Sequence, residues 1–281
     1  MQEARPSRTA LRVALRRAAH QVYDAQPLVF ADPLAVPILG KEYLPEMERT
    51  RFKLAKPHSI ALRAFLVARS RYAEEQLTRA VQHGVMQYVL LGAGLDTFAY
   101  RNPHANLHVY EIDHPATQEW KRHLLAESSI AIPESLTYVP VDFEHQLLQE
   151  QLAEAGFDAA KPAFFAWLGV VPYLTAEAFR STLALIASSP HGSGLVMDYG
   201  QPRNALPLME RLSRDSMSAR VASVGEPFQL FFTPEDMQWE LRAFHDIEDI
   251  GTDELNARYF ADRTDSLRAM GAGGRIVSAW L

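Results

Sequence analysis

The sequence predicts an α/β fold built on a doubly wound, mostly parallel sheet of seven strands, with helices at the N-terminus and a helical insertion. Two observations lead to this prediction. Between residues 86 and 199, short apolar runs alternate with longer amphipathic segments, which is typical of right-handed crossovers between parallel strands. The first run stops at Gly92 and Gly94, as a parallel strand does when the backbone beyond it must approach a ligand.

Residues 1–84 are predicted to form an N-terminal helical cap. The arginines between residues 5 and 17 lie on one side of an amphipathic pattern, and we expect a solvated face on a packed helix rather than a membrane-surface helix. Gly40 to Pro57 contains two prolines and many charges, and we expect it to be a mobile flap over a ligand. The predicted helices cover residues 7–24, 31–39 (opening with Asp32-Pro33) and 58–82.

Residues 85–199 are predicted to form the main part of the sheet domain. Five apolar runs are the predicted strands, and amphipathic segments between them are the predicted helices. The strands are expected at 86–91, 107–112, 136–141, 162–168 and 194–199, and the helices at 116–128, 145–155 and 175–188. This alternation predicts helices on both faces of the sheet.

The pattern changes after Gly200. Residues 200–242 are predicted to be a helical insertion, and residues 243–281 are predicted to return to the sheet domain. The helices are expected at 205–223, at 234–242 with Thr233 as its cap, and at 252–269, and the strands at 243–250 and 274–280. Because the insertion follows the carboxyl end of a strand, where α/β sheets bind ligands, we expect a substrate lid.

The composition excludes several classes of function. The chain has 281 residues, 48% of them hydrophobic and 22% charged, which is ample sequence for a buried core. A net charge of −6 gives no electrostatic reason to expect nucleic acid as a partner. With no cysteine, disulfides and thiol catalysis are excluded. No apolar stretch approaches the ~20 residues that span a bilayer, and no signal-peptide core follows the basic start, so we expect a cytoplasmic protein.

Acidic residues follow the second and third predicted strands. Asp113 lies about 20 positions after Gly92, near the separation at which an acid on the second strand meets ribose hydroxyls. Asp142 and Phe143 follow the third strand. This pair suits an adenine ring, because the carboxylate can accept from the exocyclic amine while the aromatic ring packs on the base. Three consecutive strand ends therefore predict one site for a nucleotide-like ligand.

Four blocks of sequence form a specific combination. They are Ala-Arg-Ser-Arg-Tyr at 68–72, Gln-Tyr-Val-Leu-Leu-Gly-Ala-Gly-Leu-Asp-Thr at 87–97, Tyr-Glu-Ile-Asp-His-Pro at 110–115 and Trp-Leu-Gly-Val-Val-Pro-Tyr-Leu-Thr at 167–175. The combination resembles the leucine carboxyl methyltransferase family, including its bacterial branch of polyketide-type O-methyltransferases. The resemblance implies a Rossmann-like class I methyltransferase fold with a terminal antiparallel strand, and S-adenosyl-L-methionine as the cofactor.

The resemblance also implies which residues bind the cofactor. These are Arg69 for the methionine carboxylate, Gly92 and Gly94 for the methionine and ribose region, Asp113 for the ribose hydroxyls, and Asp142 with Phe143 for the adenine. The chain departs from the eukaryotic members at Leu168, where they carry a glutamate that helps to seat the cofactor. The Trp-Leu-Gly sequence at 167–169 is similar to that of the bacterial branch. We therefore do not expect this chain to share the protein-phosphatase substrate of the eukaryotic enzymes.

The sequence offers three candidates for a catalytic group and no clear base. A carboxylate acceptor is ionised at neutral pH and needs no base, whereas a phenol or alcohol gains from one. His114 follows the ribose acid, while Tyr173 and Tyr199 lie near the ends of the fourth and fifth strands, and each also fits as a cap or rim residue. The ten histidines show no metal-ligand spacing, so no metal is expected.

The predicted activity is transfer of a methyl group from S-adenosyl-L-methionine to a carboxylate or hydroxyl of a small molecule. Two alternatives stay open. An NAD(P)-binding oxidoreductase would use a similar glycine turn, although Thr97 stands where its third glycine belongs. A non-catalytic S-adenosyl-L-methionine-binding protein would keep the cofactor pocket alone.

Arg69→Ala and Asp113→Ala are each predicted to weaken cofactor binding and to leave the fold intact. The acceptor and the oligomeric state are not predicted.

Overall fold

The computed structural model describes residues 7–49, 51–142, 146–222, 225 and 227–281. It confirms the predicted α/β class, with one sheet of seven strands in the order β3-β2-β1-β4-β5-β7-β6. The strands are β1 Gln87–Leu91, β2 His108–Asp113, β3 Leu136–Pro140, β4 Ala163–Trp167, β5 Gly194–Gly200, β6 His245–Ile250 and β7 Gly274–Trp280. The first five strands pair in parallel, and β7 runs antiparallel to both β5 and β6. The parallel strands therefore end at one common edge.

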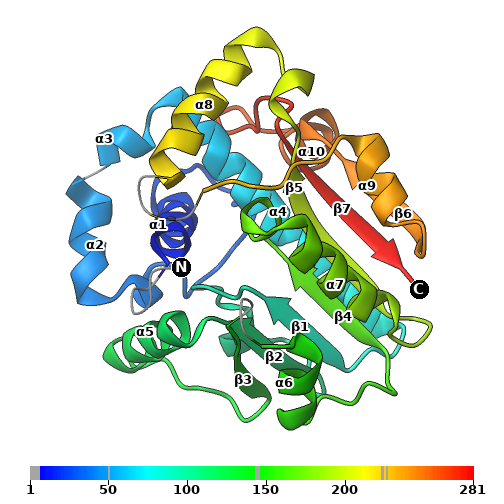
Figure 1. Cartoon of the computed structure of the whole chain (residues 1–281). Helices are drawn as coiled ribbons and strands as arrows, with labels where there is room; N and C mark the ends of the chain where they lie inside the picture. Colours follow the sequence, from blue (N-terminus) through cyan, green and yellow to red (C-terminus); the bar gives the residue numbers. More distant parts are fainter. Residues whose placement is uncertain (1–6, 50, 143–145, 223–224, 226) are drawn as a thin grey trace.

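The helices cover both faces of this sheet, and the N-terminal helices gather on one side of the molecule (Figure 1). The α-helices are α1 Arg8–Tyr23, α2 Gly40–Arg49, α3 Arg51–Leu54, α4 Pro57–Gln82, α5 Pro115–Glu127, α6 Leu148–Glu154, α7 Ala176–Ala187, α8 Leu208–Ala222, α9 Pro234–Glu240 and α10 Thr252–Tyr259. Short 3₁₀ turns are η1 Pro37–Leu39, η2 Phe98–Tyr100, η3 Val171–Tyr173 and η4 Arg203–Ala205. Thr233 caps α9 as predicted, in a capping box with Asp236. Among the described residues, no helix is long and apolar enough to span a membrane.

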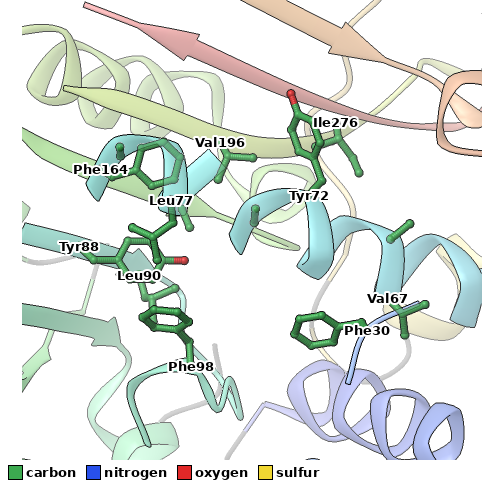
Figure 2. Packing of buried hydrophobic residues seen from close by; sticks show 14 of the residues in the cluster. Phe30, Val67, Tyr72, Leu77, Tyr88, Leu90, Phe98, Phe164, Val196 and Ile276 are labelled. Atoms are coloured by element: carbon green, nitrogen blue, oxygen red, sulfur yellow. The ribbon is translucent and has the colours of Figure 1, made fainter. Parts of the chain in front are cut away.

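The core forms where α4 packs on the sheet. Every residue of β1 and β4 is buried, as expected for central parallel strands that are covered on both faces. Figure 2 shows Tyr72 and Leu77 of α4 in the same cluster as Tyr88 of β1, Phe164 of β4 and Val196 of β5. Since α4 is fixed by this packing, a polar side chain on its free face has a defined position relative to the strand ends.

The prediction that the segment from Gly40 to Pro57 lies over the ligand is wrong for its described residues, whereas its mobility stays a prediction. The segment contains α2 and α3, with Pro45 inside α2. Met47 is 2% exposed, and the Tyr43 ring lies edge-on to Trp120 of α5 at 5.9 Å between ring centroids. The apolar contacts of this segment therefore stabilise the helix by more than it loses through the one backbone hydrogen bond that Pro45 cannot donate. The segment packs beside α5, and none of its described residues (40–49 and 51–57) lines the large cavity described below.

Two predicted helices are shorter in the structure. The stretch 31–39 forms turns and ends in the 3₁₀ turn η1, and the Asp32 carboxylate in it pairs with Arg17 of α1. The helix predicted at 252–269 ends at Tyr259, and the chain then folds back toward the N-terminal region. Arg263 holds this return by donating to the carbonyl oxygens of Pro27 at 2.6 Å and Ala25 at 2.9 Å. The return of the chain after Tyr259 is thus fixed by contacts between residues far apart in the sequence.

Candidate cofactor site at the carboxyl ends of the strands

A large cavity opens at the carboxyl ends of the parallel strands. Its volume is about 1050 Å³. It is lined by the turn after β1, the end of β2, the residues that follow β3, the loop from β4 into α7, residues of α1, and Gly225, Pro227 and Gln229. The ends of three consecutive strands thus face one space, which is the usual place for a ligand in an α/β sheet.

The turn after β1 requires glycine at both positions that the sequence singled out. Gly92 has φ +70° and Gly94 has φ +50°, in the region that side chains disfavour. A Cβ at Gly92 would lie 2.3 Å from Cγ2 of Val170, and one at Gly94 would lie 3.1 Å from Cβ of Ala10. Both glycines line the cavity. The turn can therefore pack against Val170 and Ala10 only where these two positions carry no side chain.

Asp113 ends β2 beside this turn. Its Oδ2 accepts the Gly94 N–H at 2.6 Å and its Oδ1 accepts the His114 N–H at 2.7 Å. Burial raises the pKa of Asp113, and the two amide donors offset this only in part. The carboxylate is thus fixed in orientation, and each oxygen keeps a lone pair that can accept from a ligand hydroxyl.

Arg69 reaches the cavity from α4. It is 6% exposed, and its Nη1 donates to Oδ2 of Asp198 on β5 at 2.8 Å. The other carboxylate oxygen of Asp198 accepts the Gly169 N–H at 2.5 Å. In the part of the chain that the structure describes, the buried Nε of Arg69 has no hydrogen-bond partner. The guanidinium therefore keeps a donor for a ligand while Asp198 fixes its plane.

Asp142 follows β3 and lines the cavity. Its backbone N–H donates to Oε1 of Gln146 at 2.9 Å. Phe143, which was predicted to pack on an adenine ring, lies outside the described residues.

The three predicted catalytic candidates lie in different surroundings. His114 lines the cavity and caps α5, with its Nδ1 accepting the Ala116 N–H at 3.2 Å. Tyr173 lines the cavity from η3, and its ring packs on Phe228. Tyr199 is a correction: it is 2% exposed, does not line the cavity, and donates its hydroxyl to Asp249 of β6 at 2.5 Å. Because successive residues of a strand point to opposite faces, Asp198 faces Arg69 and Tyr199 faces away from it.

Sequence reasoning missed the contribution of α1. Arg17 was expected on a solvated face, but it is 4% exposed and pairs with Asp32 at 2.5 Å and with Asp96 at 3.2 Å. Burial alone would lower the pKa of Arg17, but the two carboxylates raise it above its usual value. Ala10 and Val13 of the same helix line the cavity. The pairing of Arg17 with Asp96 can be recognised only when the position of α1 in the fold is known.

The residues of the cavity fit S-adenosyl-L-methionine. The guanidinium of Arg69, whose buried Nε has no partner among the described residues, suits a carboxylate, and the Asp113 carboxylate suits ribose hydroxyls. The glycine turn lines the same cavity, and a Cβ at Gly92 or Gly94 would press on Val170 or Ala10. Within the described ranges, no group of three or more His, Asp or Glu residues is placed to hold a metal ion.

Comparisons with known proteins agree with this geometry. The model of the leucine carboxyl methyltransferase family matches residues 10–187. YktD of Bacillus subtilis, a presumed S-adenosyl-L-methionine-dependent methyltransferase, is 32% identical over 96% of this chain and 96% of its own length. A presumed methyltransferase of the same cofactor type from Mycobacterium ulcerans is 34% identical over 68% of this chain and 64% of its own length.

Solved structures share the fold. A presumed methyltransferase of Thermobifida fusca matches 99% of this chain and 96% of its own with a TM-score of 0.60 at 16% identity. A DUF574 family protein of Streptomyces avermitilis matches 87% of this chain and 94% of its own with a TM-score of 0.54 at 19% identity. With the family model matching well over half of the sequence, the chain belongs to the leucine carboxyl methyltransferase family.

Proposed function

We propose that this methyltransferase transfers the methyl group of S-adenosyl-L-methionine to an oxygen atom of a small-molecule acceptor, either a carboxylate or a hydroxyl. The family membership and the B. subtilis relative support the cofactor. The observation that carries the proposal is the common cavity of the glycine turn, Asp113, Asp142 and Arg69, which come from four separate segments.

Each of these residues has one role in the proposal. The guanidinium of Arg69 binds the methionine carboxylate, and Asp113 accepts hydrogen bonds from the ribose hydroxyls. Asp142 accepts from the exocyclic amine of adenine. Gly92 and Gly94 let the backbone approach the ligand between these points.

The reaction places few demands on the protein. When bound, S-adenosyl-L-methionine would supply an activated methyl group that leaves its electron pair on sulfur. A hydroxyl acceptor would give up its proton to water, whereas a carboxylate acceptor has none to lose. The protein has to hold the acceptor in line and exclude water. α1 also lines the cavity, together with Gly225, Pro227 and Gln229, and these are the parts that exclude water in this proposal.

Thr97 disfavours the alternative of an NAD(P)-binding oxidoreductase. It occupies the position of the third glycine of the dinucleotide motif, where close approach of helix and strand is required. It is 1% exposed, and its Oγ1 donates to Asp32 at 2.8 Å and accepts from Arg17 at 2.8 Å. This hydroxyl is part of the hydrogen-bond network that holds α1. Position 97 therefore anchors a helix here, whereas the third glycine of the dinucleotide motif allows a helix and a strand to pack closely.

Ligand-dependent stability tests the cofactor assignment. At ~100 times its dissociation constant, S-adenosyl-L-homocysteine should raise the free energy of unfolding by about 2.7 kcal/mol, because it binds only the folded chain. NAD at the same concentration should leave the thermal midpoint unchanged. Stabilisation by NAD, or no shift with S-adenosyl-L-homocysteine, would contradict the proposal. Transfer of a labelled methyl group to an oxygen acceptor then separates an enzyme from a binding protein.

Affinity for S-adenosyl-L-homocysteine should depend on pH through Asp113. Burial raises the pKa of Asp113, so on acidification it takes up a proton at a higher pH than an ordinary aspartate and then accepts ribose hydroxyls poorly. Affinity should be full above that pKa and fall as the pH drops through it. Asp113→Asn should lose about 1.5–3 kcal/mol of binding energy at neutral pH and flatten the curve.

Isothermal titration calorimetry across the pH range checks this. Asp158→Asn is the matched control, because Asp158 is an exposed aspartate that pairs with Lys161 and does not line the cavity. A pH profile of Asp113→Asn identical to that of the parent chain would remove Asp113 from the ribose site.

A further inference from the structure

Ser70 of α4 carries a hydroxyl that the fold does not use. The residue is 8% exposed and lines the cavity, directly after Arg69 in the sequence. Among the described residues its hydroxyl has no hydrogen-bond partner. It does not donate to the backbone carbonyl four positions earlier, as the hydroxyl of Thr78 does to Glu74 on the same helix. It is also absent from the fully buried polar atoms that lack a partner, so it is reached from the cavity.

The cavity has an apolar floor where α4 packs on the sheet. Leu90 of β1 and Ala166 of β4 are register partners in neighbouring strands. Both line the cavity, and both belong to the core cluster that contains Val67 and Ala68 of α4. Arg69 and Ser70 follow these two helix residues directly, so they enter the cavity at the edge of this floor.

Arg69 and Ser70 approach the floor from different sides. The guanidinium of Arg69 lies toward β4 and β5, because it donates to Asp198 and lies close to Gly169 after β4. Residues four apart share one face of a helix, and Glu74, four positions after Ser70, accepts from Arg101, which follows the turn after β1. Ser70 therefore lies on the β1 side. A small anion above the floor can take one donor from each side.

An anion at this position needs a donor besides Arg69. Among the described residues that line the cavity, guanidinium or ammonium groups come only from Arg17 and Arg69. Arg17 pairs with Asp32 and Asp96, and Arg69 pairs with Asp198. Each of these arginines is thus already neutralised by a carboxylate. A hydroxyl that donates to the anion adds a hydrogen bond to a charged group without burying a further charge.

We propose that Ser70 is a further cofactor-binding residue, whose hydroxyl donates to the methionine carboxylate of S-adenosyl-L-methionine beside the guanidinium of Arg69. Two successive positions of α4 then hold one carboxylate, and packing of α4 on the sheet fixes both. This inference rests on the proposed function and deepens it, because it adds a residue that distinguishes the cofactor from analogues that lack the carboxylate.

Two ligands that differ in one group test the assignment. S-adenosyl-3-thiopropylamine has the adenosine, the sulfur and the amine of S-adenosyl-L-homocysteine but no carboxylate. Ser70→Ala should lower the affinity for S-adenosyl-L-homocysteine on the order of ten-fold, which is about 1.4 kcal/mol, and should leave the affinity for the amine unchanged. Calorimetry measures the first affinity, and ligand-observed NMR, which detects weak binding, measures the second.

Ser59→Ala is the matched control. Ser59 is a buried serine of the same helix, 9% exposed, and it does not line the cavity. Its replacement should leave both affinities unchanged. Urea unfolding of Ser70→Ala adds a second readout. The midpoint should not fall below that of the parent chain, because the hydroxyl of Ser70 has no partner among the described residues.

The outcomes distinguish the inference from the proposed function. Unchanged affinity for S-adenosyl-L-homocysteine in Ser70→Ala overturns the inference. An equal loss for both ligands also overturns it, since the hydroxyl then acts away from the carboxylate, and a lowered urea midpoint assigns the hydroxyl to the fold. Failure of S-adenosyl-L-homocysteine to bind the parent chain overturns the proposed function itself.

Discussion

Arg69→Ala should lower both the affinity for S-adenosyl-L-homocysteine and the stability of the fold. The loss of affinity should be about 1.5–3 kcal/mol, because a charge-assisted hydrogen bond to the methionine carboxylate is removed. The loss of stability should be about 3–5 kcal/mol, because Asp198 is left buried without its partner 2.8 Å away. The sequence alone predicts only the first effect with the fold intact, since it does not show the Asp198 pair.

A double variant separates the two effects. Arg69→Ala combined with Asp198→Ala removes the unpaired carboxylate, so it should regain part of the free energy of unfolding measured in urea. It should not regain affinity in calorimetry, because no guanidinium faces the ligand. Recovery of affinity in the double variant would show that Arg69 acts only as the counterion of Asp198. Arg69→Lys, which keeps the charge but loses the planar fork, should fall between the parent chain and Arg69→Ala in affinity.

The parts of the site predicted from the sequence are those encoded by short stretches. Gly92 and Gly94 stop an apolar strand within a few residues, and Asp113 follows the next strand at a spacing that one crossover sets. Parallel strands in one register bring such residues to one edge, whatever the rest of the chain does. For this reason both the glycine turn and the acid beside it could be predicted from local pattern alone.

The remaining parts depend on pairs that are far apart in the chain. Arg69 and Asp198 are separated by 129 positions, and Arg17 and Asp96 by 79. No periodicity or spacing rule links residues at such distances. The helices α2 and α3 were missed for a related reason: Pro45 and the charged residues indicate a loop, and only packing of Tyr43 and Met47 against distant residues favours a helix.

Arg17 connects α1 to the motif that follows β1. Its guanidinium donates to Asp32 at 2.5 Å, to Thr97 at 2.8 Å and to Asp96 at 3.2 Å, while Ala10 of the same helix lies against the glycine turn. Helix α1 thus forms one wall of the cavity, and its position is fixed by contacts with the motif that borders the proposed cofactor site. Binding at the glycine turn and the position of α1 should therefore depend on the same contacts.

Arg17→Ala should consequently lower the free energy of unfolding by about 3 kcal/mol, the low end for breaking a buried ion pair, because Asp32 is fully buried and loses Arg17 but keeps Arg101 and Thr97. Affinity for S-adenosyl-L-homocysteine should fall as well, since α1 then no longer holds the wall of the cavity. Urea unfolding and calorimetry measure the two effects. Arg8→Ala, at an exposed position of the same helix, should stay within about 0.5 kcal/mol of the parent chain. If Arg17→Ala loses stability but binds the ligand with unchanged affinity, α1 supports the fold without forming a functional wall of the site.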